Sequence, residues 1–245
     1  MTQYENLERL VIFDVDGTTV DAFHAIEMAF LRHDMDIGDI DRFQKRRKLF
    51  KFIGGLREFP TNLRHQFGKQ SRKRLRETLT EVYRHEACLY PGIDLLLRKL
   101  LDMPDIRVGL ITRNVTIEPE KTLQCLFQRH GIGTDEFDYF ACIPLKENKT
   151  KHLRFARQSF AINPARAYAC GDEYSDYQAA ISAGMHPFVV SYGFESGARL
   201  TKKFEVPGEV ISTSPAEFIN RLTHALNLPG EAAYLQQDSR KATTP

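Results

Sequence analysis

Two carboxylates that stand two residues apart directly follow an apolar run near the start of the chain. The run is Arg9–Phe13, and the segment after it reads Asp14-Val-Asp16-Gly17-Thr18. Placing two carboxylates at the end of a buried strand is unfavourable unless another charge offsets them. Gly17 allows the backbone to turn sharply, which would bring Asp16 back over the same site. An Asp-Gly turn that closes a strand is the simpler interpretation, but the second aspartate and Thr18 favour a functional site.

A second acidic motif, Gly171-Asp172-Glu-Tyr-Ser-Asp176, follows another apolar run. Asp176 falls about one helical turn beyond Asp172, so both side chains can face one cavity. Several carboxylates that converge at one edge of a sheet favour a hard divalent cation, and Mg²⁺ suits such a set of oxygens. A helix N-cap role for Asp172 or Ser175 is an alternative that could coexist with metal binding. The candidate metal ligands are Asp14, Asp16, Asp172 and Asp176.

Two further elements could bind an anion. Thr112 ends a third apolar run and is followed closely by Asn114. A hydroxyl at that position can donate to an anionic oxygen, helped by backbone N–H groups, although Thr and Asn at strand ends are more often turn or capping residues. Lys149 stands at the start of a predicted helix, where a cation is mildly unfavourable against the helix dipole. Contact with an anion would explain its position, but each of Lys146, Lys149 and Lys151 could also be an ordinary surface lysine.

The segments around these motifs predict a parallel β-sheet. Short apolar runs alternate with helical patterns, as the buried strands of such a sheet do. The predicted strands are Arg9–Phe13, Ile106–Ile111, Phe137–Cys142, Ala165–Cys170 and His186–Val190. The predicted helices are Lys149–Gln158, Ser175–Ala183 with Gly184 as its C-cap, and a last helix that runs from a Ser214-Pro-Ala-Glu217 capping box to about Leu226. The expected fold class is α/β with a doubly wound parallel sheet, in which ligands bind at the C-terminal ends of the strands.

A helical block interrupts the alternation after the first strand. Between about Val20 and Glu86 no convincing strand is visible, whereas Ala22–Arg32 and Ser71–His85 have helical periodicity. We interpret the block as an all-helical cap domain inserted at the C-terminal edge of the sheet. The expected division is a core of residues 1–19 and 87–230, a cap of residues 20–86 and a disordered tail of residues 231–245. The block is also basic, because fourteen Lys and Arg stand against four acidic residues from Arg42 to Glu86.

Composition narrows the class of protein. A formal net charge of +2 over 245 residues is too small to indicate binding to nucleic acid or to a membrane. The four cysteines are scattered without a CxxC pair, so no zinc knuckle or redox motif is visible. No apolar run approaches the roughly 20 residues that span a bilayer, and the first residues lack the pattern of a signal peptide. The expected location is the cytoplasm, and the oligomeric state cannot be read from the sequence.

The motifs, taken in order, resemble those of the haloacid dehalogenase (HAD) superfamily. The matching elements are Asp14-Val-Asp-Gly-Thr18, Thr112, Lys149 and Gly171-Asp172-Glu-Tyr-Ser-Asp176. Tyr90-Pro-Gly92, Asp176-Tyr-Gln-Ala-Ala180, Ala183-Gly-Met185 and Tyr192-Gly193 are similar to segments of the phosphoglycolate phosphatase-like subgroup, which has a helical cap. The resemblance favours Lys149 over Lys146 because 23 positions (172 − 149) separate Lys149 from Asp172. Arg113 departs from the pattern, being bulkier than the residue that is expected after the threonine.

The resemblance implies a Mg²⁺-dependent phosphatase that acts on a small phosphate monoester. Asp14 would be the nucleophile that forms an aspartyl-phosphate, and Asp16 would be the general acid and then the general base. Thr112 and Lys149 would hold the transferring oxygens. Mg²⁺ would bind an Asp14 oxygen, the Asp16 backbone carbonyl and Asp172, with Asp176 in support. The substrate-binding candidates are Asn114 and a cap loop that contains Gly54, Gly55 and Arg57.

Three alternatives are weighed against this hypothesis. A dehalogenase of the same superfamily lacks the acid at the position of Asp16. A phosphomutase would keep all the motifs and differ in the cap, so the sequence does not separate it from a phosphatase. A protein that binds nucleic acid or another polyanion through the basic cap is less favoured, because basic residues on helices are more often a solvated face and no regular stacking aromatics accompany them.

Overall fold

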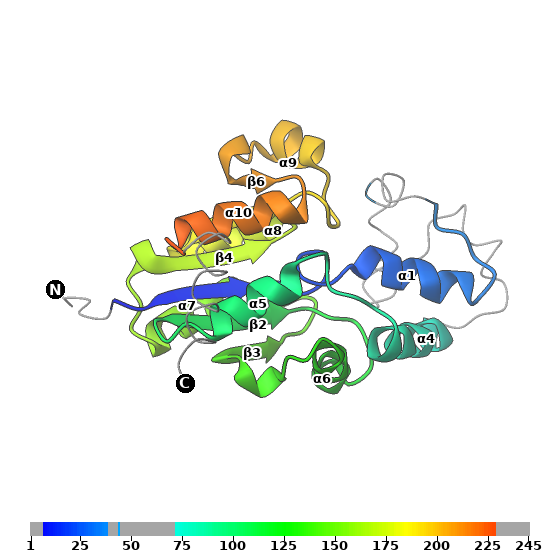
Figure 1. The fold of residues 1–245 in the computed structure, drawn as a ribbon. Helices are drawn as coiled ribbons and strands as arrows, with labels where there is room; N and C mark the ends of the chain where they lie inside the picture. The colour runs from blue at the N-terminus through cyan, green and yellow to red at the C-terminus, as the bar shows by residue number, and fades with distance from the viewer. Residues whose placement is uncertain (1–6, 39–43, 45–71, 229–245) are drawn as a thin grey trace, which may run out of the picture.

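The computed structural model describes residues 7–38, residue 44 and residues 72–228, and a six-stranded sheet forms its centre (Figure 1). The strands are β1 (Arg9–Phe13), β2 (Ile106–Thr112), β3 (Tyr139–Cys142), β4 (Ala167–Gly171), β5 (His186–Val190) and β6 (Ile211–Ser212). All neighbouring strands are parallel, in the order β3-β2-β1-β4-β5-β6. The chain proceeds outward in opposite directions on the two sides of β1. The C-terminal end of β1 is therefore the topological switch point, where ligands bind in sheets of this type.

The five predicted strands are all present, and β1 and β5 have the predicted bounds. The sixth strand, β6, is not predicted by the sequence because a strand of two residues carries no periodicity. With the sheet parallel and the helices around it, the predicted α/β fold class is confirmed.

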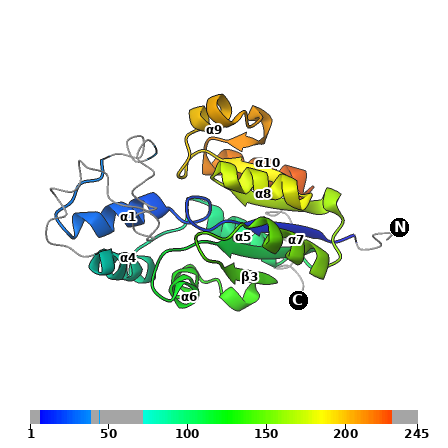
Figure 2. The same ribbon diagram turned by 180° about the vertical axis from the view of Figure 1, so that it is seen from behind.

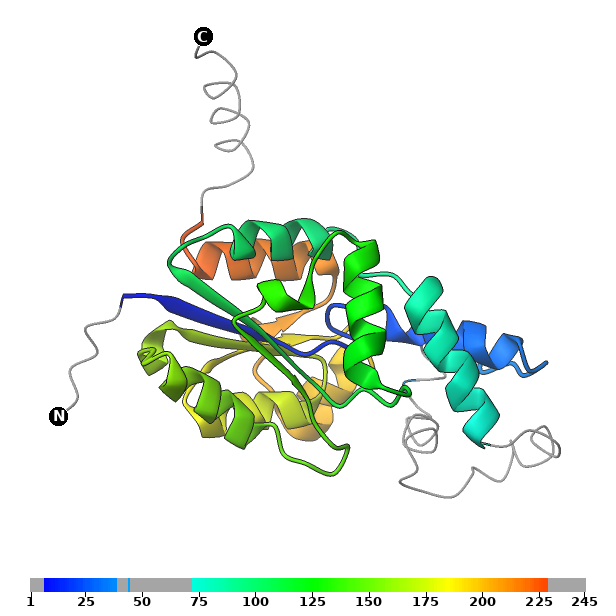
Figure 3. The same ribbon diagram turned by 90° about the horizontal axis from the view of Figure 1, so that it is seen from below.

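Helices cover both faces of the sheet, as Figures 2 and 3 show. The helices are α1 (Ala22–Leu31), α4 (Arg72–His85), α5 (Ile93–Leu101), α6 (Pro119–Arg129), α7 (Thr150–Ser159), α8 (Tyr174–Ala183), α9 (Gly197–Phe204) and α10 (Pro215–Ala225), with 3-10 turns η2 (Thr134–Glu136), η3 (Pro164–Arg166) and η4 (Gly208–Val210). On β1, Val11 and Phe13 pack with the cluster under α5, α6 and α10, whereas Leu10 and Ile12 pack with the cluster under α7 and α8. Alternate side chains of a strand point to opposite faces, so β1 is buried from both sides.

The two ends of α8 can be compared with the predictions from the sequence. Gly184 ends α8 in the left-handed region at φ 68°, as the sequence predicts. At the other end of α8 the N-cap is Glu173, so the alternative that gives this role to Asp172 or Ser175 is wrong. The Glu173 N–H donates to Asp176 Oδ2 at 3.0 Å. A carboxylate in the first turn satisfies a free N–H there and is favourable near the positive end of the helix.

The two described helices of the inserted block, α1 and α4, lie beyond the C-terminal ends of the strands and pack against each other (Figure 1). Both helices match their predicted ranges to within one residue. Leu75, Leu79 and Val82 of α4 are buried at the helical spacing of an amphipathic face. The candidate loop residues Gly54, Gly55 and Arg57 lie outside the described residues, as does the predicted tail. The bounds of core and cap stay a prediction. Among the described helices, we find none with the length and apolar character needed to cross a bilayer.

Candidate active site

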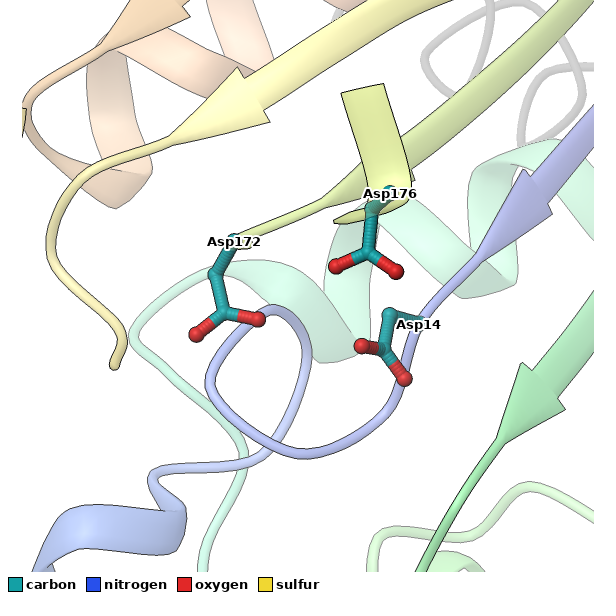
Figure 4. Close-up of side chains that lie close together, drawn as sticks. All are labelled: Asp14, Asp172 and Asp176. Carbon is teal, nitrogen blue, oxygen red and sulfur yellow. The ribbon is translucent and has the colours of Figure 1, made fainter. Parts of the chain in front are cut away.

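Three carboxylates meet at the C-terminal edge of the sheet (Figure 4). Asp14 follows β1, Asp172 follows β4, and Asp176 belongs to the first turn of α8. Because β1 and β4 are parallel neighbours that pair Phe13 with Cys170, the residues just after both strands emerge side by side. One ligand oxygen from each of the three aspartates lies within 4.8 Å of the others. Their exposed fractions are 7%, 0% and 8%, so these charges are largely removed from water.

Two glycines lie close to the side chain of Asp172. Gly17 has a φ of +83°, and a Cβ on it would stand 2.4 Å from Asp172 Oδ2. A Cβ on Gly193 would stand 2.4 Å from the same oxygen. Only glycine permits both the backbone conformation at Gly17 and this spacing. The Phe194 N–H donates to Asp172 Oδ2 at 2.5 Å, whereas Asp172 Oδ1 is buried and has no hydrogen-bond partner among the described residues.

Two cations face the carboxylates. Lys149 Nζ lies 2.6 Å from Asp14 Oδ2 and 2.8 Å from Asp176 Oδ1. Arg113 Nη2 lies 3.0 Å from Glu173 Oε2 and 3.9 Å from Asp176 Oδ1. Arg113, which departs from the pattern of the resemblance, therefore belongs to the charge balance of the site. Buried charges of this kind require such partners.

The electrostatics of the cluster follow from burial and from the neighbouring charges. Burial, together with the charge of Asp176, raises the pKa of Asp14 to about 7 even though Lys149 opposes the shift. Burial and the Asp14 charge raise the pKa of Asp172 well above its usual range. Burial alone would raise the pKa of Asp176, but the ion pairs with Lys149 and Arg113 outweigh it and lower that pKa. The pKa of Lys149 is raised, because its two carboxylate partners outweigh the effect of burial.

The three candidate lysines occupy different environments. The side chain of Lys149 is only 6% exposed, whereas Lys146 and Lys151 are exposed. Lys151 pairs with Glu147 on the surface of α7. Of the three, only Lys149 is placed to touch a group bound at Asp14. Lys149 is the N-cap of α7, so the helix begins one residue after its predicted start.

Thr112 also lies where the sequence places it, at the end of β2. It is fully buried, and its Oγ1 has no hydrogen-bond partner within the described part of the chain. Leaving a buried hydroxyl unpaired is unfavourable. An anionic oxygen bound at the edge of the sheet would give this hydroxyl an acceptor.

Asp16 is held differently from the three clustered aspartates. Its Oδ1 accepts a hydrogen bond from the Tyr83 hydroxyl at 2.8 Å. The Asn114 amide Nδ2 donates to Oδ1 at 3.1 Å and to Oδ2 at 3.0 Å. Burial raises the pKa of Asp16, and the bonds from Tyr83 and Asn114 oppose that shift. Asn114, a substrate-binding candidate from the sequence, thus contacts Asp16.

Tyr83 is the functional candidate that the sequence motifs miss. It lies outside every motif, but Leu75, Leu79 and Val82 place it on the buried side of α4. A buried tyrosine hydroxyl usually finds a partner, and this is the signal that could have marked it. Its partner, Asp16, is 67 residues away in the sequence, so helical periodicity alone does not reveal the contact.

The donor set fits a Mg²⁺ ion. Asp14, Asp172 and Asp176 supply clustered carboxylate oxygens, which are the ligands that hard divalent cations prefer. The unpaired Asp172 Oδ1 points to a missing positive partner. The side chain of Asp16 is turned to Tyr83 and Asn114, so its predicted part in metal binding would fall to the backbone carbonyl.

Comparison with known proteins shows the family to which the chain belongs. The model of the haloacid dehalogenase-like hydrolase family matches residues 8–184, and a second model of HAD-like hydrolases matches residues 149–224. The chain belongs to the haloacid dehalogenase-like hydrolase family. The predicted family and the prediction of a hydrolase are therefore confirmed.

Individual relatives of this HAD-like hydrolase are distant. A phosphoglycolate phosphatase of Vibrio vulnificus (strain YJ016) is 25% identical over 235 residues, which cover 89% of this chain and 93% of the relative. The structure of a predicted phosphoglycolate phosphatase from Haemophilus somnus superposes with a TM-score of 0.60 at 17% identity, covering 91% of this chain and 99% of that one. The structure of a putative β-phosphoglucomutase from Thermotoga maritima superposes with a TM-score of 0.58 at 21% identity, covering 88% and 99%. Both superpositions show the shared fold.

Proposed function

We propose that this HAD-like hydrolase is a Mg²⁺-dependent phosphatase that cleaves a small phosphate monoester through an aspartyl-phosphate on Asp14. One observation carries the proposal. Asp14 lies among candidate metal ligands and within 2.6 Å of Lys149, whereas Asp16 contacts two neutral donors. Phosphoryl transfer needs a nucleophile with its charge offset and a separate group that moves a proton, and the two aspartates meet these two needs.

The proposed reaction has two steps. In the first, an Asp14 oxygen attacks phosphorus, the bond to the leaving oxygen breaks, and that oxygen takes a proton from Asp16. In the second, Asp16 takes a proton from a water that attacks phosphorus and frees Asp14 and inorganic phosphate. Lys149 and Thr112 would bind the oxygens of the transferring group. Mg²⁺, when bound by Asp14, Asp172 and Asp176, would offset the negative charge of nucleophile and phosphate.

The class of substrate is inferred from the relatives. The Vibrio vulnificus relative and a Pseudomonas putida protein, 26% identical over 212 residues, are both called phosphoglycolate phosphatases. At this identity the name supports a small, anionic phosphate monoester rather than one particular compound. A location in the cytoplasm is part of the same proposal.

A panel of phosphate monoesters, which includes phosphoglycolate, sugar phosphates and an aryl phosphate, tests this proposal. We expect release of inorganic phosphate with Mg²⁺, loss of release in EDTA, and recovery when Mg²⁺ is restored. Full turnover after exhaustive removal of metal would contradict the metal assignment. Conversion of a sugar phosphate to its isomer without release of phosphate would instead identify a phosphomutase.

A further inference from the structure

The hydroxyl of Tyr83 contacts the Asp16 side chain from a helix of the inserted block. Tyr83 belongs to α4, the helix that leads from the inserted block back to the sheet. Its ring is 1% exposed and packs in the main hydrophobic core. Its hydroxyl donates to Asp16 Oδ1 at 2.8 Å. The phenol is the donor in this bond, because an ionised carboxylate has only acceptor atoms.

The helix that carries Tyr83 is fixed to the segment after β2. Arg76 Nε donates to the Val115 carbonyl at 2.6 Å, and Arg76 Nη2 donates to the Thr116 carbonyl at 2.9 Å. One turn later, the Ile117 N–H donates to Thr80 Oγ1 at 2.9 Å. These contacts lie on the same face of α4 as Tyr83, because residues three and four apart are neighbours on a helix. The position of the hydroxyl is therefore set by the contacts between α4 and the segment after β2.

The second donor to Asp16 is fixed in the same way. Asn114 Oδ1 accepts from the Thr116 N–H at 3.0 Å, which orients the amide so that Nδ2 faces Asp16. Asp16 Oδ1 then receives two donors, Tyr83 and Asn114, whereas Oδ2 receives Asn114 alone. The two carboxyl oxygens of Asp16 are thus not equivalent.

We propose that Tyr83 is a positioning residue that orients Asp16 for proton transfer. With Oδ1 occupied by two donors, Oδ2 is the oxygen left to carry the proton to the leaving group. The phenol carries no charge, so it fixes the direction of the carboxyl group by a hydrogen bond alone. Since Tyr83 lies on α4, the position of the inserted block also sets the orientation of Asp16. This inference rests on the proposed function of Asp16 as acid and base.

Replacement of Tyr83 by Phe, which removes only the hydroxyl, tests the inference through a series of leaving groups. For an alkyl phosphate, whose leaving group needs a proton, we expect kcat/KM to fall by about 10-fold or more. This loss is part of the roughly 10²- to 10⁴-fold rate increase that proton transfer supplies. For nitrophenyl phosphate, whose leaving group needs little help, we expect a fall of less than about 2-fold. An equal loss for every leaving group would show a merely structural role and would overturn the inference. Tyr90→Phe is the matched control, because the Tyr90 hydroxyl is buried without a hydrogen-bond partner among the described residues. We expect this control to leave the leaving-group dependence of wild type.

A second variant leaves Tyr83 and Asp16 intact. Arg76→Met removes the bonds to the Val115 and Thr116 carbonyls and loosens α4 on the core. We expect it to lower kcat/KM for the alkyl phosphate selectively, though less than Tyr83→Phe does. An Arg76→Met enzyme that loses no alkyl-phosphate activity would contradict the coupling between α4 and Asp16.

A stability measurement separates failure of this inference from failure of the proposed function. Thermal unfolding of wild type, Tyr83→Phe, Asp16→Ala and the double variant forms a double-mutant cycle. We expect Tyr83→Phe to lower Tm by several degrees when Asp16 is present and to have little effect in the Asp16→Ala background. Equal effects in both backgrounds would overturn the contact even in an active enzyme. If the cycle shows coupling but no phosphate ester is cleaved, the proposed function fails and the catalytic role of Tyr83 fails with it.

Discussion

Asp14 and Asp16 stand two residues apart in one motif, yet the protein surrounds them with opposite kinds of group. Asp14 faces a lysine ammonium and two further carboxylates. Asp16 faces a phenol and an amide, neither of which carries charge. Only Val15 stands between the two aspartates in the loop after β1, and we call their surroundings the charged side and the neutral side of this turn. The proposed function assigns the attack on phosphorus to the charged side and proton exchange to the neutral side.

The comparison also explains how the site tolerates so many acids. On the Asp14 side, two cations and an expected Mg²⁺ offset the cluster, because carboxylates removed from water need positive partners. On the Asp16 side, hydrogen bonds from neutral donors stabilise the carboxylate without fixing its charge.

The largest effect is expected on the charged side of the turn. Asp14→Asn removes the attacking oxygen, so we expect kcat to fall at least about 10⁴-fold and covalent labelling by substrate phosphate to disappear. Steady-state kinetics and phosphoenzyme trapping check this. Near wild-type kcat in this variant would end the nucleophile assignment and with it the distinction between the two aspartates.

A smaller and more selective effect is expected at Asp16. Asp16→Asn keeps the size of the side chain but cannot deliver a proton to the leaving group. We therefore expect about a 10²- to 10⁴-fold loss of kcat/KM for alkyl phosphates. A nitrophenyl phosphate, whose leaving group needs little help, should still phosphorylate Asp14. Rapid-quench measurement of the phosphoenzyme distinguishes this pattern from the complete loss that is expected for Asp14→Asn.

The contribution of Lys149 to the charge balance around Asp14 can be tested by measuring the stability of the protein. Lys149→Met leaves Asp14 and Asp176 buried without their ammonium partner, and we expect the metal-free protein to lose about 3 kcal/mol of unfolding free energy. Lys146→Met, three residues earlier and exposed, should change the unfolding free energy by less than about 0.5 kcal/mol. Denaturant unfolding of both variants in EDTA makes the comparison. Equal losses would show that Lys149 does not balance the cluster.

Metal and pH should act together on the same cluster. The pKa of Asp14 is raised to about 7 and that of Asp172 is raised well above its usual range, so the folded metal-free protein binds protons that the unfolded chain has released. The stability contributed by Asp14 is present at low pH and is lost as pH rises through about 7. Mg²⁺ needs ionised carboxylates, so the increase in Tm on adding Mg²⁺ should be larger at about pH 8 than at about pH 6. A Tm increase that is independent of pH would contradict this linkage.

How much of this could be predicted from the sequence depends on whether a feature is local. The apolar runs Arg9–Phe13 and His186–Val190 gave strands with the observed bounds, and the motif order gave the sheet edge where Asp14 and Asp172 meet. The two-residue strand β6 and the Tyr83 contact could not be predicted. The first is too short to have a period, and the second joins residues from two elements that are far apart in sequence.

Arg113 is a second residue whose contacts could not be predicted from the sequence. Its size is visible in the sequence as a departure from the expected pattern, but its use is not. Only the folded chain brings its guanidinium, which follows β2, to Glu173 and Asp176 at the start of α8. A side chain of this kind can be noticed in a sequence and still be understood only once its neighbours are known.

The smallest expected effect concerns the basic segment beyond the site. Of its fourteen bases, Arg76 donates to two backbone carbonyls and Arg84 pairs with Glu118, so part of this charge joins the inserted helix to the core. The rest could draw anionic substrate toward the edge of the sheet, and salt screens such a field over roughly 8–10 Å near physiological ionic strength.

We therefore expect kcat/KM for a multiply charged substrate to fall with added salt more steeply than for a singly substituted aryl phosphate. Arg57, in the predicted substrate loop, is the first residue to replace. Arg57→Ala should raise KM for the multiply charged substrate by a few-fold, an effect of roughly 1 kcal/mol, and should leave the aryl phosphate rate nearly unchanged. If kcat/KM falls equally with salt for both substrates and the Arg57→Ala enzyme is unaffected, these bases only form a solvent-exposed outer face of the cap. The inserted block would then act on the reaction through the contact of Tyr83 with Asp16 and not through its positive charge.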